Sequence, residues 1–208
     1  MNVSKHASSL RQAIIVTSGF VLVLWLIELA DFGLDLGLAV YGVLPRTEQG
    51  LTGILLAPMI HGSWEHIVSN TLPLLLLGSI LIYGYPRSRV PALMAIWLIS
   101  GAGVWLFGRT SYHFGASGLT HGMFFYLFVS GMLRRDRRSV ALLMIAFFMY
   151  GGMLLTIFPG EPGVSFEYHL FGALGGLLAA IVLRRHDPPP KRKRYSWEES
   201  DDDDSQPH

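Results

Sequence analysis

The stretch HFGASGLTHG, residues 113–122, places a serine between glycines and near histidines at the start of an apolar segment. A serine hydroxyl is a poor nucleophile until a neighbouring base accepts its proton, and histidine suits that role because its unperturbed pKa lies near neutrality. Gly115 and Gly118 permit tight turns and the close approach of another backbone to Ser117. The alternative is a serine that hydrogen-bonds its own helix backbone one turn back. Ser117 is therefore a candidate nucleophile.

A histidine in a second segment is the candidate base. His169 opens HLFGALGG, in which Gly172 and Gly176 form a G-x-x-x-G step that lets a neighbouring helix pack closely. If that neighbour carries Ser117, His169 is placed to accept the serine proton. Simple helix packing, with an interfacial histidine, is the alternative.

A third segment, HGSWEHIVSN at residues 61–70, adds hydrogen-bond donors. His66 and Asn70 are four residues apart and so share one helix face. With the backbone N–H of Ser117 they would form an oxyanion hole, in which one donor is worth about 3 kcal/mol. Helix–helix hydrogen bonding inside a bundle explains the pair equally well.

The composition places these residues in a membrane protein. The chain is 51% hydrophobic and only 15% charged, whereas a soluble domain is about 25% charged. The absence of cysteine excludes disulfides, a thiol nucleophile and thiolate metal sites. The histidines show no H-E-x-x-H pattern and no matching carboxylate set, so we expect neither a metal nor a cofactor. The five histidines near the candidate site are His61, His66, His113, His121 and His169.

Six segments approach the roughly 20 apolar residues that a membrane-spanning helix needs. The mixed connection at residues 32–64, which contains Pro45 and Pro58, is expected to form a helical stretch in the membrane interface or a partly re-entrant one. No cleavable signal peptide is evident, so the first segment is interpreted as a span. The predicted spans are residues 13–31, 65–85, 90–108, 116–133, 139–158 and 167–183.

The distribution of Lys and Arg predicts the orientation. With both termini in the cytoplasm, 14 of the 16 basic residues fall on the cytoplasmic side, and only Arg46 and Arg109 fall outside. The segments that begin near His66, Ser117 and His169 then all descend from the outer face. Polar side chains at one depth within spans are costly and so are candidates for function.

The expected organisation has three parts: a cytoplasmic N-terminus at residues 1–12, a catalytic core at residues 13–183 and a disordered cytoplasmic tail at residues 184–208. The KRKR cluster at residues 191–194 either contacts anionic lipid head groups or is simply solvated. The loop at residues 159–169, PGEPGVSFEYH, suits a mobile cap over the site or an ordinary connector.

These three motifs, in this order, resemble the rhomboid family of intramembrane serine proteases. The resemblance covers residues 13–183 and implies an all-α, polytopic membrane protein, a six-transmembrane-helix bundle with an interfacial first loop. It implies a Ser–His dyad of Ser117 as nucleophile and His169 as general base. Other matches are His66 and Asn70, which correspond to the family's oxyanion-stabilising pair, and His61, which corresponds to a further histidine on the loop before that helix.

Two positions depart from the family pattern. Many bacterial members carry an aromatic residue one helical turn after the serine, packed on the catalytic histidine; here the residue is His121, which we expect to stack on or hydrogen-bond to His169. The Trp–Arg pair of the family's first loop is not recognisable, so weaker anchoring of that loop is expected. Around the dyad, Gly115 and His61 are expected to join His66 and Asn70 in stabilising the oxyanion or the substrate, with His121, Gly118 and Gly172 behind them.

The resemblance implies an intramembrane serine endopeptidase of a bacterial inner membrane that cleaves transmembrane segments near the outer face. The expected partners are transmembrane protein substrates and membrane lipids, with no nucleic acid. Three alternatives remain open. One is a non-proteolytic relative that binds and escorts transmembrane helices, although such relatives typically lose the serine or the histidine. The others are a metal site and a small transporter, which would show inverted repeats and midplane charges.

Overall fold

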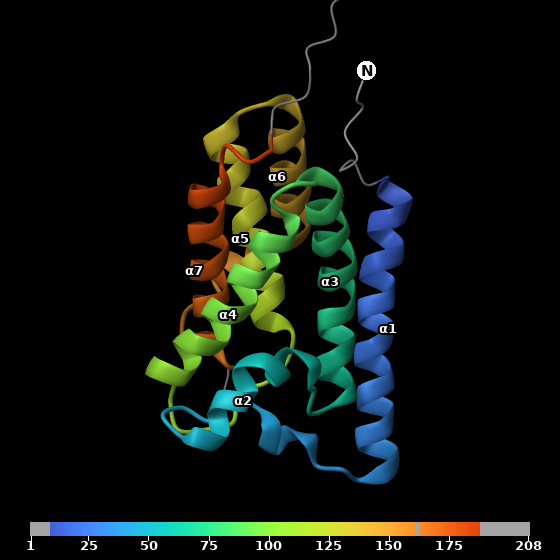
Figure 1. Cartoon of the computed structure of the whole chain (residues 1–208), viewed down its shortest axis with the longest axis vertical. Helices are drawn as coiled ribbons and strands as arrows, with labels where there is room; N and C mark the ends of the chain where they lie inside the picture. Colours follow the sequence, from blue (N-terminus) through green and yellow to red (C-terminus); the bar gives the residue numbers. More distant parts are fainter. Residues whose placement is uncertain (1–8, 161–162, 188–208) are drawn as a thin grey trace, which may run out of the picture.

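The computed structural model describes residues 9–160 and 163–187, and within that part the chain folds into α-helices joined by short 3₁₀ turns (Figure 1). The predicted N-terminal segment lies mostly, and the KRKR cluster entirely, outside the described residues. The helices are α1 (Leu10–Leu34), α2 (Glu48–Leu56), α3 (Trp64–Gly84), α4 (Arg89–Phe107), α5 (Ser117–Arg134), α6 (Arg137–Tyr150) and α7 (Phe166–Leu183), and the 3₁₀ turns are η1 (Leu38–Tyr41), η2 (Ala57–Met59) and η3 (Gly151–Leu154).

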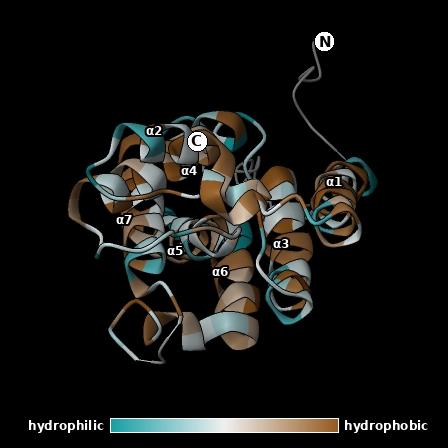
Figure 2. Ribbon diagram, turned by 90° about the horizontal axis from the view of Figure 1, so that it is seen from below, coloured by the Kyte–Doolittle hydropathy of each residue, from teal (hydrophilic) through white to brown (hydrophobic). Residues whose placement is uncertain are grey.

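Helix α5 lies at the centre of the bundle. Figure 2, which looks along the bundle from the end at which α5 begins, shows α3, α4, α6 and α7 around it and α1 at the edge beside α3. Eleven of the 18 residues of α5 are buried, against five of 25 in α1. The polar side chains of α5 therefore face protein rather than lipid.

Five helices in the described part of the chain are long and apolar enough to cross a membrane, judged by length and composition: α1, α3, α4, α6 extended to Leu154, and α7. Their outer faces are apolar (Figure 2), and side chains such as Phe32 and Phe148 are 72% and 75% exposed. Soluble monomers rarely expose apolar surface on this scale. The more polar α5 is not among the five, so the count of six spans stays a prediction.

The predicted spans agree with α1, α3, α4, α5 and α7 to within three residues at each end. The fifth predicted span, residues 139–158, was wrong at its end. Helix α6 is regular only to Tyr150, because Gly151 and Gly152 follow and glycine weakens a helix. The chain continues through η3 into a turn at residues 155–157.

The connection between α1 and α3 contains the predicted helical stretch, as η1, α2 and η2. It is anchored in spite of the missing Trp–Arg pair. The Arg46 guanidinium donates to the carbonyls of Leu106 and Gly108, at 3.3 and 2.9 Å, and the Trp105 indole donates to the Thr47 carbonyl at 2.8 Å. An arginine and a tryptophan from separate segments thus anchor this connection, for which the missing Trp–Arg pair had predicted weaker anchoring.

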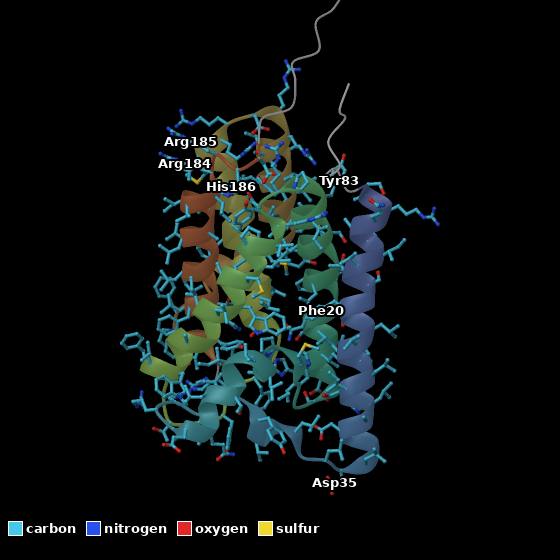
Figure 3. All side chains as sticks on the ribbon, in the orientation of Figure 1. Phe20, Asp35, Tyr83, Arg184, Arg185 and His186 are labelled. Carbon is cyan, nitrogen blue, oxygen red and sulfur yellow. The ribbon has the colours of Figure 1, made fainter. Side chains whose placement is uncertain are left out.

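The helix ends fall into two groups. Arg184 and Arg185 lie at one end of the bundle and Asp35 at the opposite end (Figure 3). We call the first the basic end, because the turn between α3 and α4, the turn between α5 and α6, and the end of α7 all carry arginine there. We call the other the site end; α3, α5 and α7 begin there (Figure 1). Which end faces the cytoplasm stays a prediction.

Candidate active site

The segment before Ser117 is held against the connection between α1 and α3. Val43 and His113 form an isolated antiparallel bridge, with backbone N–O distances of 2.8 and 2.9 Å. The Gly115 N–H donates to the Ala57 carbonyl at 2.8 Å. Helix α5 then begins at Ser117 itself. The candidate nucleophile therefore occupies the first turn of the central helix.

Gly115 satisfies two requirements at once. Its φ of +108° lies in a region that L side chains rarely adopt, and a Cβ atom there would lie 2.5 Å from the imidazole of His66. Any side chain at this position would displace the ring. Gly115 therefore lies beside His66, but its own atoms do not line the cavity described below, and its part in oxyanion or substrate stabilisation stays a prediction.

Helices α5 and α7 meet with almost nothing between their backbones. A Cβ on Gly172 would lie 2.1 Å from the Gly118 carbonyl oxygen, and one on Gly176 would lie 2.0 Å from that of Gly122. The close packing predicted from the G-x-x-x-G step of α7 is confirmed. Sequence reasoning missed Gly122, although Gly118 and Gly122 form a second step of the same spacing.

Ser117 and His169 line one cavity of about 1030 Å³ at the site end. His66, Asn70 and His121 line it too, so the structure brings together side chains from α3, α5 and α7. His61, Gly118 and Gly172 support the walls from outside this lining. Exposed residues such as Glu65 and Ser69 also belong to the wall, so the cavity reaches the protein surface.

The rings of His121 and His169 are stacked, with centroids 3.9 Å apart and planes 9° apart. His169 Nδ1 lies 3.0 Å from the Thr156 carbonyl oxygen. Since a carbonyl oxygen only accepts, Nδ1 carries the hydrogen, and Nε2 of the neutral ring keeps its lone pair. This is the tautomer that a general base beside a serine requires.

His121 is held at both of its nitrogens. Nδ1 donates to the Ser117 carbonyl at 2.7 Å, so in the neutral ring Nε2 accepts, and its partner at 2.8 Å is the Thr156 hydroxyl. Thr156 therefore contacts both stacked histidines. Sequence reasoning missed it, because it lay inside the last turn of a predicted span with no motif around it.

Among the hydrogen bonds of the described residues, none joins the Ser117 hydroxyl to the His169 ring. Catalytic hydrogen bonds without substrate are often long and tighten only in the complex. Ser117 is partly exposed, whereas His169 is buried to 8% exposure. The two groups share the cavity wall, and their pairing as a dyad remains a prediction.

The predicted oxyanion donors lie on the α3 side of the cavity. The Asn70 amide donates to the His66 carbonyl one turn back, at 3.0 Å. A side-chain amide carries two N–H groups, so a second donor remains. The His66 ring makes an edge contact with His61, with centroids 5.0 Å apart, and tilts against Phe114.

His61 lies behind His66, in the turn before α3. Its side chain is 2% exposed, and neither ring nitrogen has a hydrogen-bond partner among the described residues. Burial, together with the neighbouring His66 ring, lowers the pKa of His61 from 6.5 to about 3. His61 is therefore neutral at physiological pH and packs against the ring that faces the cavity.

The start of α7 is tied to the loop before α5. The Ser165 hydroxyl accepts from the Tyr168 N–H at 3.2 Å, as a helix cap, and lies 2.6 Å from His113 Nδ1. In residues 9–160 and 163–187, no group of three His, Asp, Glu or Cys side chains is arranged to hold a metal ion. The arrangement is thus one of hydrogen-bonding side chains around a serine.

Comparison with known proteins gives the family. The family model described as Rhomboid domain matches residues 48–186. Uncharacterized proteins of Mycobacterium tuberculosis and Mycobacterium bovis are each 38% identical over 170 residues, which cover 77% of this chain and 71% of the relative. An uncharacterized protein of Mycobacterium leprae is 35% identical over 171 residues, covering 77% of this chain and 67% of its own. The matched range contains all the residues of the cavity, and the chain is a multi-pass membrane protein that belongs to the rhomboid family.

Proposed function

We propose that this protein is an intramembrane serine endopeptidase in which Ser117 is the nucleophile and His169 is the general base. The observation that carries the proposal is the hydrogen bond from His169 Nδ1 to the Thr156 carbonyl, at 3.0 Å. It leaves Nε2 of the ring as the acceptor, within the cavity that Ser117 also lines. A base in the other tautomer would have a hydrogen on that nitrogen and would not accept the serine proton.

The first turn of α5 supports an oxyanion site. The first backbone N–H groups of a helix have no partner within it and attract negative charge. At α5 the capping residue is Ala116, which has no side-chain acceptor to occupy them. Together with the amide of Asn70 and the ring of His66, these groups would stabilise a negatively charged oxygen beside Ser117.

The reaction then follows from these positions. The Ser117 hydroxyl attacks a peptide carbonyl while His169 accepts its proton, and the resulting oxyanion is held by the donors around it. His169 next protonates the leaving amine, and water, entering through the cavity, releases the acyl-enzyme. The substrate would be a transmembrane segment that contains weak helix formers, because its carbonyls must leave their helical hydrogen bonds.

The cellular setting of the proposal is a bacterial inner membrane, with both termini in the cytoplasm and the site end toward the outer face. This orientation places the arginines of the basic end on the cytoplasmic side, in keeping with the excess of Lys and Arg in cytoplasmic loops. Tagging each end of the chain with a topology reporter checks it, and a reporter active outside at either terminus would refute it.

The test is labelling of detergent-solubilised protein by a fluorophosphonate, which reacts with activated serines, together with cleavage of a model transmembrane substrate. We expect wild type to be labelled and Ser117→Ala and His169→Ala to be unlabelled and inactive. Ser100→Ala is the matched control, because the Ser100 hydroxyl donates to its own helix, at the Trp97 carbonyl. A folded wild type that is neither labelled nor active would refute the proposal and favour a helix-binding, non-proteolytic protein.

A further inference from the structure

The connection between α6 and α7 contributes one residue that touches both stacked histidines. Thr156 lies in the turn at residues 155–157, after η3, and is exposed at the surface. Its carbonyl oxygen is 3.0 Å from His169 Nδ1, and its hydroxyl is 2.8 Å from His121 Nε2. The hydroxyl has one weaker alternative, the Met153 carbonyl at 3.4 Å.

The ring of His121 is fixed from both sides by these contacts. Nδ1 is held by the Ser117 carbonyl on α5, and Nε2 is held by Thr156 on the connection. A ring bonded at one nitrogen can pivot, whereas a ring bonded at both has a defined plane. Since His169 stacks on that plane at 3.9 Å, the orientation of the base depends on the orientation of His121.

The hydroxyl of Thr156 is needed because the residue at 121 is a histidine. His121 is 4% exposed, so a ring nitrogen without a partner would be a buried, unsatisfied acceptor. A hydrocarbon ring at this position would stack on His169 without any such requirement. The chemistry of His121 therefore makes the site depend on a residue outside the bundle helices.

We propose that Thr156 is a positioning residue: its hydroxyl orients the base through His121, so that the dyad is competent only when the α6–α7 connection is seated against α5 and α7. This inference rests on the proposed function. It assigns the connection a part in assembling the site, in addition to any part as a cover. A displacement of residues 155–157 would break the contacts to both histidines together.

The central experiment uses Thr156→Val, which keeps the shape and the backbone carbonyl and removes the hydroxyl. We expect kcat for a model transmembrane substrate to fall roughly tenfold, which corresponds to about 1.4 kcal/mol, the scale of one hydrogen bond. KM should not change, because the substrate contacts are intact. Thr156→Ser should restore kcat. Rates are normalised to the folded fraction, measured by gel filtration in detergent.

Thr52→Val is the matched control. Thr52 is an exposed residue of α2 whose hydroxyl donates to the Gln49 carbonyl, three residues back, at 2.8 Å. The same loss of a surface hydroxyl at this position should leave kcat and KM at their wild-type values.

A double-mutant cycle separates positioning from general disturbance. In a His121→Phe background the ring has no nitrogen to bond, so adding Thr156→Val should lower kcat no further. A second tenfold loss in that background would overturn the inference, as would a wild-type kcat in Thr156→Val alone. A folded but inactive wild type would refute the dyad and the positioning role together, whereas an active wild type with a fully active Thr156→Val refutes the positioning role alone.

Discussion

The two ends of the bundle use buried polar groups in different ways. At the basic end the side chains of Asp187 and Arg134 are bonded to backbone and to a charged neighbour. Asp187, 4% exposed, accepts from the N–H groups of Arg87 and Ser88 at 2.8 and 3.0 Å. Arg134 donates to the backbone carbonyl of Asp187 and to the carboxylate of Asp136. These contacts close the turn between α3 and α4 against the end of α7.

At the site end the unbonded buried groups in the described part of the chain include ionisable side chains, whereas at the basic end they are the hydroxyls of Tyr85 and Ser88. Both nitrogens of His61 and one carboxylate oxygen of Glu167 are buried and unbonded among the described residues. The N-terminus of α5 is capped by an alanine. Unpaired polar groups are costly in a protein interior, and both His61 and Glu167 lie outside the cavity lining, in the structure around it. The two ends thus differ in kind: buried charge is paired with charge and with backbone at the basic end, whereas at the site end buried ionisable groups stay partly unbonded beside the cavity.

The largest effect that would sharpen this contrast is expected from Asn70→Ala. It removes a predicted oxyanion donor, so kcat should fall by about 10²–10³-fold, while the thermal unfolding midpoint stays close to that of wild type. Substrate cleavage and a melting curve in detergent measure both quantities. An unchanged kcat would show that Asn70 serves only helix packing, the alternative that the sequence left open.

A smaller effect, on stability and not on catalysis, is expected from Asp187→Asn. The amide would turn an N–H group toward backbone donors, and losing such charge-assisted bonds costs about 2 kcal/mol. The unfolding midpoint should fall, while fluorophosphonate labelling of the folded protein is unchanged. Asp35→Asn, at an exposed position of the site end, is the control and should change neither. Lost labelling in folded Asp187→Asn would show that the two ends are coupled.

The smallest effect concerns the pH dependence of stability, and the two ends should lose stability over different pH ranges. Burial and the neighbouring His66 ring hold the pKa of folded His61 at about 3, below its ordinary 6.5. Folded protein therefore binds fewer protons than unfolded protein, and the contribution of His61 to stability is full above pH 6.5 and is lost as pH falls toward 3.

Asp136, at the basic end, responds at lower pH. Burial acts to raise the pKa of this carboxyl, but hydrogen bonds from Ser139 and the nearby Arg134 together hold it below 3.8. Its contribution is thus full above pH 3.8 and is lost only below that value. Melting curves against pH should show His61→Gln reducing the slope between pH 6.5 and 4. Asp136→Asn should lower the midpoint at all pH values above 4 and change the slope only below 4. A wild type whose midpoint is flat between pH 6.5 and 4 would contradict this order.

The helices and the close contact of α5 with α7 were predictable because they depend on local patterns. Apolar runs gave five helix positions to within three residues. The glycines at 172 and 176 predicted a close helix contact, since a residue without a side chain lets a neighbouring backbone approach whatever else surrounds it. The stacking of His121 on His169 was one of the two contacts, stacking or a hydrogen bond, that the family resemblance implied.

Contacts made by turns were not predictable. Thr156 contacts the two histidines through its carbonyl and its hydroxyl, in a turn that follows the glycine pair at the end of α6, and nothing in the local sequence marks that turn. Asp187 was assigned to a charged tail, because its partners are backbone N–H groups about a hundred residues earlier in the chain. Such contacts are decided by how the helices pack, which a reading of local patterns does not contain.

The glycine contact between α5 and α7 has a consequence for how the protein adapts to bilayers of different thickness. Main-chain atoms of the two helices touch directly, so their spacing is limited by hard contact and not by deformable side chains. Bilayers differ in thickness, and embedded helices adjust by tilting. We expect that adjustment to be made by α1, which packs mainly on α3 at the edge of the bundle, so that the serine and histidine keep their relative position from one membrane to another.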